Sequence, residues 1–284
     1  MNFRIKGVSL LGAAVLLAAC SENPKKPSGT ASVKVVRDHV ASSHHRGFRR
    51  ILPYVPMPDW GPRTVDDVLV AFAPYVTNQL IPYFKAAGVD YPPRALTLVA
   101  FKQERKLEVW ARDRRSKFQF IRSYPIRAAS GTKGPKLRQG DRQVPEGIYH
   151  VVDLNPNSNY HLSMRLDYPN EYDLYYANEE GRFKPGNDIF IHGKAVSAGC
   201  LAMGDEAIEE LFVLAAHVGP ARIKVVIAPN DPRLRPLDPN TPGLPFWTPE
   251  LYREIAGEID ALVKTPPVKV SSAPPARRTD NRLR

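Results

Sequence analysis

Hydrophobic and polar positions divide the middle of the chain into short segments with a strand-like pattern. Runs rich in β-branched and aromatic residues alternate with polar turns, which is typical of β-strands. These runs cover residues 96–101, 106–111, 118–122, 147–154, 188–192 and 222–227. The pattern predicts a mainly β (α+β) fold in which strands outnumber helices.

The segment before the first strand has a helical pattern. Thr64 stands ahead of two acidic residues, as at a helix start, and the apolar-rich stretch ends at Gly88. Because proline inside a helix removes a hydrogen bond and clashes with the preceding turn, Pro74 and Pro82 should break or kink it. We therefore expect two or three short helical pieces here.

Two later helices are also predicted. Asp205 is expected to cap a helix that stops at Gly219, and Thr248 to start another that reaches about Val263. The first has apolar residues at i, i+3, i+4 and i+7, namely Ile208, Leu211, Phe212 and Ala215.

Changes in composition divide the chain into six parts. These are a lipoprotein signal peptide (1–20), a flexible tether (21–50), a short helical N-terminal segment (51–93), a catalytic domain (94–230), a C-terminal extension with a helix (231–264) and a disordered basic tail (265–284).

The N-terminus has the layout of a secretory signal. Arg4 and Lys6 precede an apolar run too short to span a membrane, and the run ends in small residues before Cys20. Residues 17–20 resemble a lipobox, in which Cys20 is lipidated, and Ser21 favours the outer membrane. The expected location is therefore periplasmic and lipid-anchored. The alternative is cleavage near Ala19 and a soluble periplasmic protein.

The net charge, taken alone, would favour a nucleic-acid partner. The chain has 40 Lys and Arg against 29 Asp and Glu, a formal net charge of +11, which is typical of nucleic-acid binding. The leader places the protein outside the cytoplasm, so we expect no nucleic-acid partner. Sequence fingerprints for zinc, nucleotides or dinucleotides are absent, and neither metal nor cofactor is expected.

The two cysteines of the chain indicate which residue could act as a nucleophile. If Cys20 carries lipid, Cys200 has no disulfide partner, and a lone thiol in an oxidising compartment is a liability unless it is used. A strand delivers His192 at its end, and a small-residue loop leads to Cys200 before a helix. An imidazole can take the proton of a nucleophilic thiol, and amides near Gly199 can hold an oxyanion. A core histidine with an inert buried thiol is the alternative.

Several motifs resemble one known family. Residues 95–227 resemble the L,D-transpeptidase catalytic domain, also called the YkuD domain, and most closely its YafK-like branch of murein L,D-transpeptidase and amidase lipoproteins. The segments that carry the resemblance are 101–110, 130–136, 140–149, 158–163, 168–170, 192–193 and 197–203. It implies an L,D-transpeptidase-type β-sandwich or barrel with a few packed helices.

The resemblance also implies roles for individual residues. Cys200 would attack the diaminopimelate carbonyl of a peptidoglycan stem peptide to form a thioester, with His192 as its base. Ser197, Gly199 and Gly193 would shape the loop and the oxyanion site. Apart from the resemblance, Tyr160 and His161 are expected to line the substrate cleft, with a structural role as the alternative for His161. Lys136 is expected to bind substrate because positive charge attracts the carboxylates of stem peptides.

Departures from the family pattern leave three outcomes open. Ala198 replaces a histidine, Ala202 replaces an arginine, and the insert between His192 and Cys200 is short. The resemblance allows crosslinking, or hydrolysis by an amidase that detaches a wall-attached lipoprotein. The missing arginine also allows a non-catalytic wall-binding lipoprotein. The expected partners are stem peptides, the membrane through the lipid anchor, and a wall-attached lipoprotein.

Overall fold

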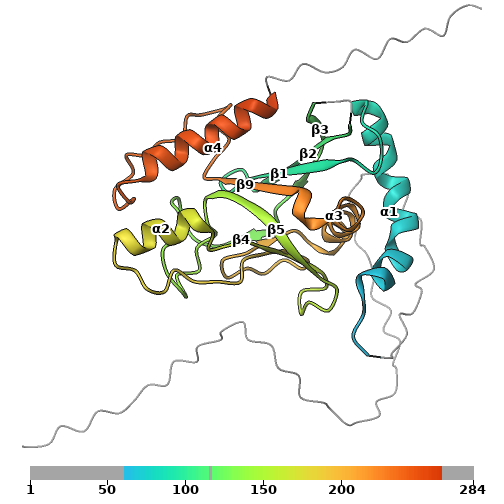
Figure 1. Ribbon diagram of the computed structural model, residues 1–284, viewed down its shortest axis with the longest axis horizontal. Helices are drawn as coiled ribbons and strands as arrows, with labels where there is room; N and C mark the ends of the chain where they lie inside the picture. The colour runs from blue at the N-terminus through green and yellow to red at the C-terminus, as the bar shows by residue number, and fades with distance from the viewer. Residues whose placement is uncertain (1–60, 115–116, 264–284) are drawn as a thin grey trace, which may run out of the picture. The chain divides into compact units, whose positions relative to one another are not determined.

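The computed structural model describes residues 61–114 and 117–263 (Figure 1). The predicted leader with Cys20, the tether and the basic tail lie outside these residues. In the described part of the chain the strands form one sheet of nine, in the order β3-β2-β1-β9-β5-β6-β7-β8-β4. The strands are β1 (Ala95–Phe101), β2 (Lys106–Arg112), β3 (Gln119–Pro125), β4 (Ala128–Ala129), β5 (Gly147–Asn155), β6 (Ser163–Leu166), β7 (Phe190–His192), β8 (Leu201–Ala202) and β9 (Ile223–Ala228).

Strand β5 joins the two halves of the sheet. Its first residues, 147–150, pair antiparallel with β9, and its later residues, 151–155, pair with β6. The register shifts between Val151 and Asp153, and such irregularities bend and twist a strand. On one side of the bend are the longer strands β1, β2, β3 and β9, and on the other are the short strands β4, β6, β7 and β8. The candidate site residues His192 and Cys200 lie in the short-strand half.

Strand β1 is buried on both faces, which explains its continuous apolar run. Leu96, Leu98 and Ala100 belong to one core, with helices α1 (Val65–Ala87) and α3 (Asp205–Val218). Val99 and Phe101 belong to the other, with helix α4 (Thr248–Val263). Figure 1 shows α4 on one side of β1 and β9 and α3 on the other. The helices of the predicted N-terminal segment and of the C-terminal extension therefore both pack against the sheet.

Helix α1 corrects the prediction of short helical pieces. It is one helix of 23 residues with both prolines inside it. Pro74 and Pro82 are exposed, so the hydrogen bonds they remove lie on the solvent side. The buried side chains Val68, Val76, Leu80 and Phe84 lie on the opposite face, and burying each contributes about 1.5–3 kcal/mol. Core packing outweighs the propensity of the prolines.

The ends of the helices agree in part with the predictions. Thr64 and Asp67 form a capping box at the start of α1, and Gly88 ends it in the left-handed conformation. In α3, however, Gly204 is the N-cap, and Asp205 is the first helical residue and not the cap. Helix α2 (Glu171–Glu179) and a short 3-10 helix at Pro220–Arg222 were not predicted. The mainly β class with a few packed helices is confirmed.

Candidate active site

The pairing of β7 with β8 brings the predicted nucleophile and base together. The strands are parallel, with Ile191 opposite Leu201 and His192 opposite Ala202. The N–H of Met203 donates to the carbonyl of His192 at 2.8 Å. Cys200 directly precedes β8, so its Cα lies about 8 Å from that of His192, given the spacing and rise of strands. Two side chains at this separation can reach each other.

The imidazole of His192 is held in one orientation. The side chain is buried, and Nδ1 lies 2.6 Å from the carbonyl oxygen of Gly193. Because a carbonyl only accepts, Nδ1 carries the proton of the neutral ring and Nε2 has the free lone pair. Burial lowers the pKa of His192, while the bond to Gly193 opposes that shift. The ring is therefore neutral near pH 7 and able to accept a proton.

The neighbours of His192 place two more predicted residues. The ring of Tyr160 lies 4.5 Å from the His192 ring, centroid to centroid, at an interplanar angle of 36°. The ring of His161 points elsewhere: Nε2 lies 2.7 Å from a carboxylate oxygen of Glu209 on α3. Tyr160 thus lies beside His192, whereas His161 connects the segment before β6 to α3.

Gly193 fills a position that has no room for a side chain. A Cβ there would lie 2.5 Å from the carbonyl oxygen of Tyr160 and 2.7 Å from a carboxylate oxygen of Asp205. The same Asp205 oxygen accepts the N–H of Lys194 at 2.8 Å. The turn after β7 therefore packs directly against the start of α3.

Hydroxyl groups hold the loop that presents Cys200. Ser197 Oγ accepts the N–H of Cys200 at 3.1 Å and donates to the carbonyl of Cys200 at 2.6 Å. The N–H of Gly199 donates to Ser130 Oγ at 2.7 Å. Ser197 therefore shapes the loop, and both amides predicted to hold an oxyanion are bonded to hydroxyl oxygens.

The Cys200 thiol itself is partly exposed. Its Sγ lies 3.8 Å from the carbonyl oxygen of Asp188, just before β7. Cys200 was predicted directly before a helix, but the short strand β8 intervenes. Asp188, Lys194 and His161 all have positive φ, of 56°, 55° and 77°. Left-handed backbone at non-glycine residues costs about 1–3 kcal/mol and is enriched at functional sites.

Lys136 is not presented to solvent near Cys200. Its side chain is buried, and Nζ donates to a carboxylate oxygen of Asp141 and to the carbonyl of Arg138. Asp141 also accepts backbone N–H groups of the same turn. The charge of Lys136 thus neutralises an internal carboxylate.

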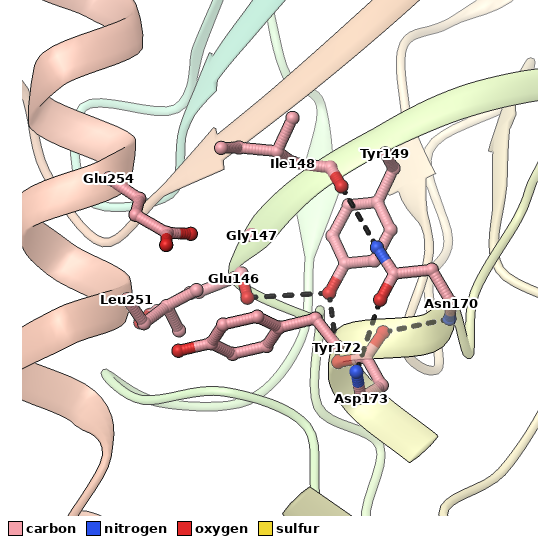
Figure 2. Close-up of a pocket in the computed structure, with 9 residues that line it drawn as sticks. All are labelled: Glu146, Gly147, Ile148, Tyr149, Asn170, Tyr172, Asp173, Leu251 and Glu254. Atoms are coloured by element: carbon pink, nitrogen blue, oxygen red, sulfur yellow. Dashed lines mark hydrogen bonds between the residues drawn. The ribbon is translucent and has the colours of Figure 1, made fainter. Parts of the chain in front are cut away.

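A separate cavity lies between β5, α2 and α4 (Figure 2). Its lining residues are Glu146, Gly147, Ile148, Tyr149, Asn170, Tyr172, Asp173, Leu251 and Glu254. Burial raises the pKa of Asp173 to about 7, although bonds from Asn170 and Tyr149 oppose the shift. The cavity includes neither Cys200 nor His192.

Across residues 61–114 and 117–263 no cluster of three side chains suited to a metal occurs.

Comparison with known proteins covers this same region. Residues 96–227 match the L,D-transpeptidase catalytic domain. This match confirms the family resemblance. The chain is also 40% identical over 114 residues to "Putative L,D-transpeptidase YafK" of Escherichia coli K12, a span of 39% of this chain and 44% of the relative. The match thus spans less than half the length of this curated relative.

Solved structures show weaker likenesses. The helical cell shape determining protein Pgp2 of Campylobacter jejuni is 20% identical, with a TM-score of 0.39 over 54% of this chain and 56% of that one. L,D-transpeptidase 1 of Mycobacterium tuberculosis is 16% identical, with a TM-score of 0.28 over 47% and 62%. At these values the likenesses do not locate site residues.

Two residues at the site were not predicted. Ser130 reaches the Cys200 loop from a position 69 residues before Gly199, and Asp205 supports the turn after His192. Neither has a local sequence signal, because its role depends on pairing between β4 and β8 or on the packing of α3.

Among the described residues, no helix has the length and apolar character needed to cross a bilayer.

Proposed function

We propose that this chain is a cysteine acyltransferase of the L,D-transpeptidase type that acts on peptidoglycan stem peptides. The observation that supports the proposal is the β7–β8 register, which brings the backbone of Cys200 near that of His192, a histidine whose Nδ1 is bonded to the carbonyl of Gly193. The match of residues 96–227 to the L,D-transpeptidase catalytic domain supports the substrate class.

In the proposed reaction, Nε2 of His192 takes the proton from the Cys200 thiol. The thiolate attacks the diaminopimelate carbonyl carbon, a C–S bond forms, and the carbonyl π electron pair moves onto oxygen. When the tetrahedral intermediate collapses, the C–N bond breaks. The imidazolium returns its proton to the leaving amine, which leaves a thioester on Cys200. No metal or cofactor takes part in these steps.

The same thioester serves two acceptors. Attack by the amine of a second stem peptide forms a crosslink, and attack by water hydrolyses the donor. Hydrolysis of a stem peptide bonded to a protein would detach a wall-attached lipoprotein. Incubation with purified disaccharide-tetrapeptide, with and without an added amine, distinguishes the two by their products.

The test of the activity compares wild type with Cys200→Ala on disaccharide-tetrapeptide. Wild type should release the terminal amino acid and yield a crosslinked or shortened muropeptide, whereas Cys200→Ala should yield neither. Full turnover by Cys200→Ala would refute the proposal. Wild type that binds peptidoglycan without turnover would instead support the wall-binding alternative.

We also propose that lipid on Cys20 tethers the enzyme to the outer membrane from the periplasmic side. The support is the lipobox-like stretch ahead of Cys20. Replacement of Cys20 by alanine should move the protein from the membrane fraction to the soluble fraction. An unchanged distribution would contradict the anchor.

A further inference from the structure

The two hydroxyl groups at the Cys200 loop are bonded differently. Ser197 makes two hydrogen bonds to the backbone of Cys200 and so braces a single turn. Ser130 makes one hydrogen bond to the backbone of the loop, from the N–H of Gly199 at 2.7 Å. The two hydroxyl groups are also hydrogen-bonded to each other, at 3.4 Å. Displacing Ser197 would break two bonds to the backbone of the loop, whereas displacing Ser130 would break one.

Ser130 is brought to this point by strand pairing. In the antiparallel pair of β4 and β8, Ala129 lies opposite Leu201. The next residue of one strand, Ser130, therefore lies beside the preceding residue of the other, Cys200. This brings the Ser130 hydroxyl to Gly199 and Ser197 of the Cys200 loop from a different part of the chain.

The backbone around Ser130 is anchored away from the loop. Its carbonyl accepts the N–H of Val144 at 3.3 Å. The side-chain oxygen of Gln143 accepts the N–H of Thr132, and a Cβ at Gly131 would lie 2.0 Å from that oxygen. Ser130 is thus held by residues 143–144 as well as by the pairing with β8.

We propose that Ser130 is an oxyanion-site residue for the acylation of Cys200, an inference that rests on the proposed function. In the resting protein its oxygen occupies the Gly199 N–H, the donor that a substrate oxygen would need. When the tetrahedral intermediate forms, that N–H turns to the oxyanion. The Ser130 hydroxyl, which keeps its proton, donates a hydrogen bond to the same oxygen. No proton changes hands at Ser130.

This arrangement gives the oxyanion two hydrogen-bond donors. The exchange costs little, because the bonds of Ser130 to Gly199 and Ser197 are replaced by bonds from Gly199 and Ser130 to a charged oxygen, and charge-assisted hydrogen bonds are the stronger ones. Removal of one oxyanion donor from an acyl-transfer enzyme lowers the rate about 100- to 1000-fold. Ser197 stays on Cys200 throughout and keeps the loop closed.

The experiment compares two reactions of Cys200 in wild type, Ser130→Ala, Ser130→Thr and the control Ser123→Ala, an exposed serine on β3. p-Nitrophenyl acetate acylates the thiol through an oxyanion, whereas iodoacetamide alkylates it without one. Ser130→Ala should lower the acylation rate about 10- to 100-fold, which is no more than the loss expected when one oxyanion donor is removed. Ser130→Thr keeps a hydroxyl group and should restore most of the wild-type acylation rate. The rate and pH profile of alkylation should stay unchanged.

Equal losses in acylation and alkylation would overturn the inference, because they would mean that Ser130 only shapes the loop or the thiol. Acylation of Ser130→Ala at the wild-type rate would overturn it too, as would a wild type that p-nitrophenyl acetate does not acylate. Acylation of wild type by the ester but not by muropeptides would contradict the proposed function and leave the role of Ser130 standing.

Discussion

Two regions of this molecule use polar groups in opposite ways. At the Cys200 loop, neutral hydroxyl and amide groups hold the backbone that carries the thiol. Between β5 and α4, ionised groups are buried. Lys102 donates to Glu146 at 2.9 Å, and both side chains are nearly inaccessible, at 8% and 0% exposure.

The buried ion pair is part of a closed network. Glu146 also accepts the Tyr252 hydroxyl of α4 at 2.8 Å and the N–H of Gly134 at 2.9 Å. Lys102 donates further to the carbonyls of Gly134 and Val144. Burial lowers the pKa of Lys102 and raises that of Tyr252. Perturbed titration is often used to locate active sites, but these two shifts arise where α4 is joined to the sheet, away from Cys200.

Loss of the base should produce the largest effect on the Cys200 side of the comparison. His192→Gln removes the proton acceptor, so the acylation rate should fall about 100- to 10,000-fold with the fold retained. Acylation kinetics and a thermal melt measure the two quantities. His150→Gln, at a half-exposed histidine paired with Asp167, is the matched control and should act like wild type. A His192→Gln variant within threefold of wild type would exclude His192 as the base.

The joint between α4 and the sheet should respond in stability. Glu146→Leu leaves the Lys102 ammonium buried without its carboxylate, so the free energy of unfolding should fall by about 3–5 kcal/mol in urea titrations. The double variant Lys102→Met/Glu146→Leu should recover most of it. Glu258→Gln, which breaks a partly exposed pair with Lys224, should cost about 1 kcal/mol or less. Equal losses from the buried and the partly exposed pair would contradict the comparison.

A pH-dependent effect on stability is expected at the cavity of Figure 2. The pKa of Asp173 is raised by burial to about 7, so the folded state binds this proton more tightly than the unfolded state. The stability it contributes is complete below its unfolded pKa near 4 and is lost as pH rises to 7, by up to about 1.4 kcal/mol per pH unit. Asp173→Asn should flatten this slope between pH 4 and 7 in urea titrations. An unchanged slope would exclude Asp173 as its source.

Much of the fold followed from local pattern. The longer strands were predicted because their alternation or continuous apolar character is visible within a few residues, as in β1 and β9. Strands β4 and β8 have two residues each and exist only through pairing, so no pattern could indicate them. Helix α2 did leave a signal, since Asn170 and Asp173 form a capping box. The prolines of α1 led to a wrong prediction of short helical pieces, because a helix tolerates proline on its exposed face and the local sequence does not show which face is buried.

The site was predictable only as far as its chemistry was local. His192 and Cys200 lie on one short segment, so their residue types and order indicated a thiol and its base. The second donor we propose, Ser130, comes from a distant segment through the β4–β8 register. The pairing of Lys136 with Asp141 was likewise not predicted, because formal charge does not show which groups neutralise each other inside the fold.

The most direct test of the central claim is intact-protein mass spectrometry of residues 21–284 after incubation with disaccharide-tetrapeptide or a carbapenem, beside Cys200→Ala. An acylated Cys200 predicts a mass increase in wild type and none in the variant, with the adduct on the peptide that contains residue 200. A folded wild type that gains no mass with either compound, or an adduct that persists in Cys200→Ala, would contradict the account.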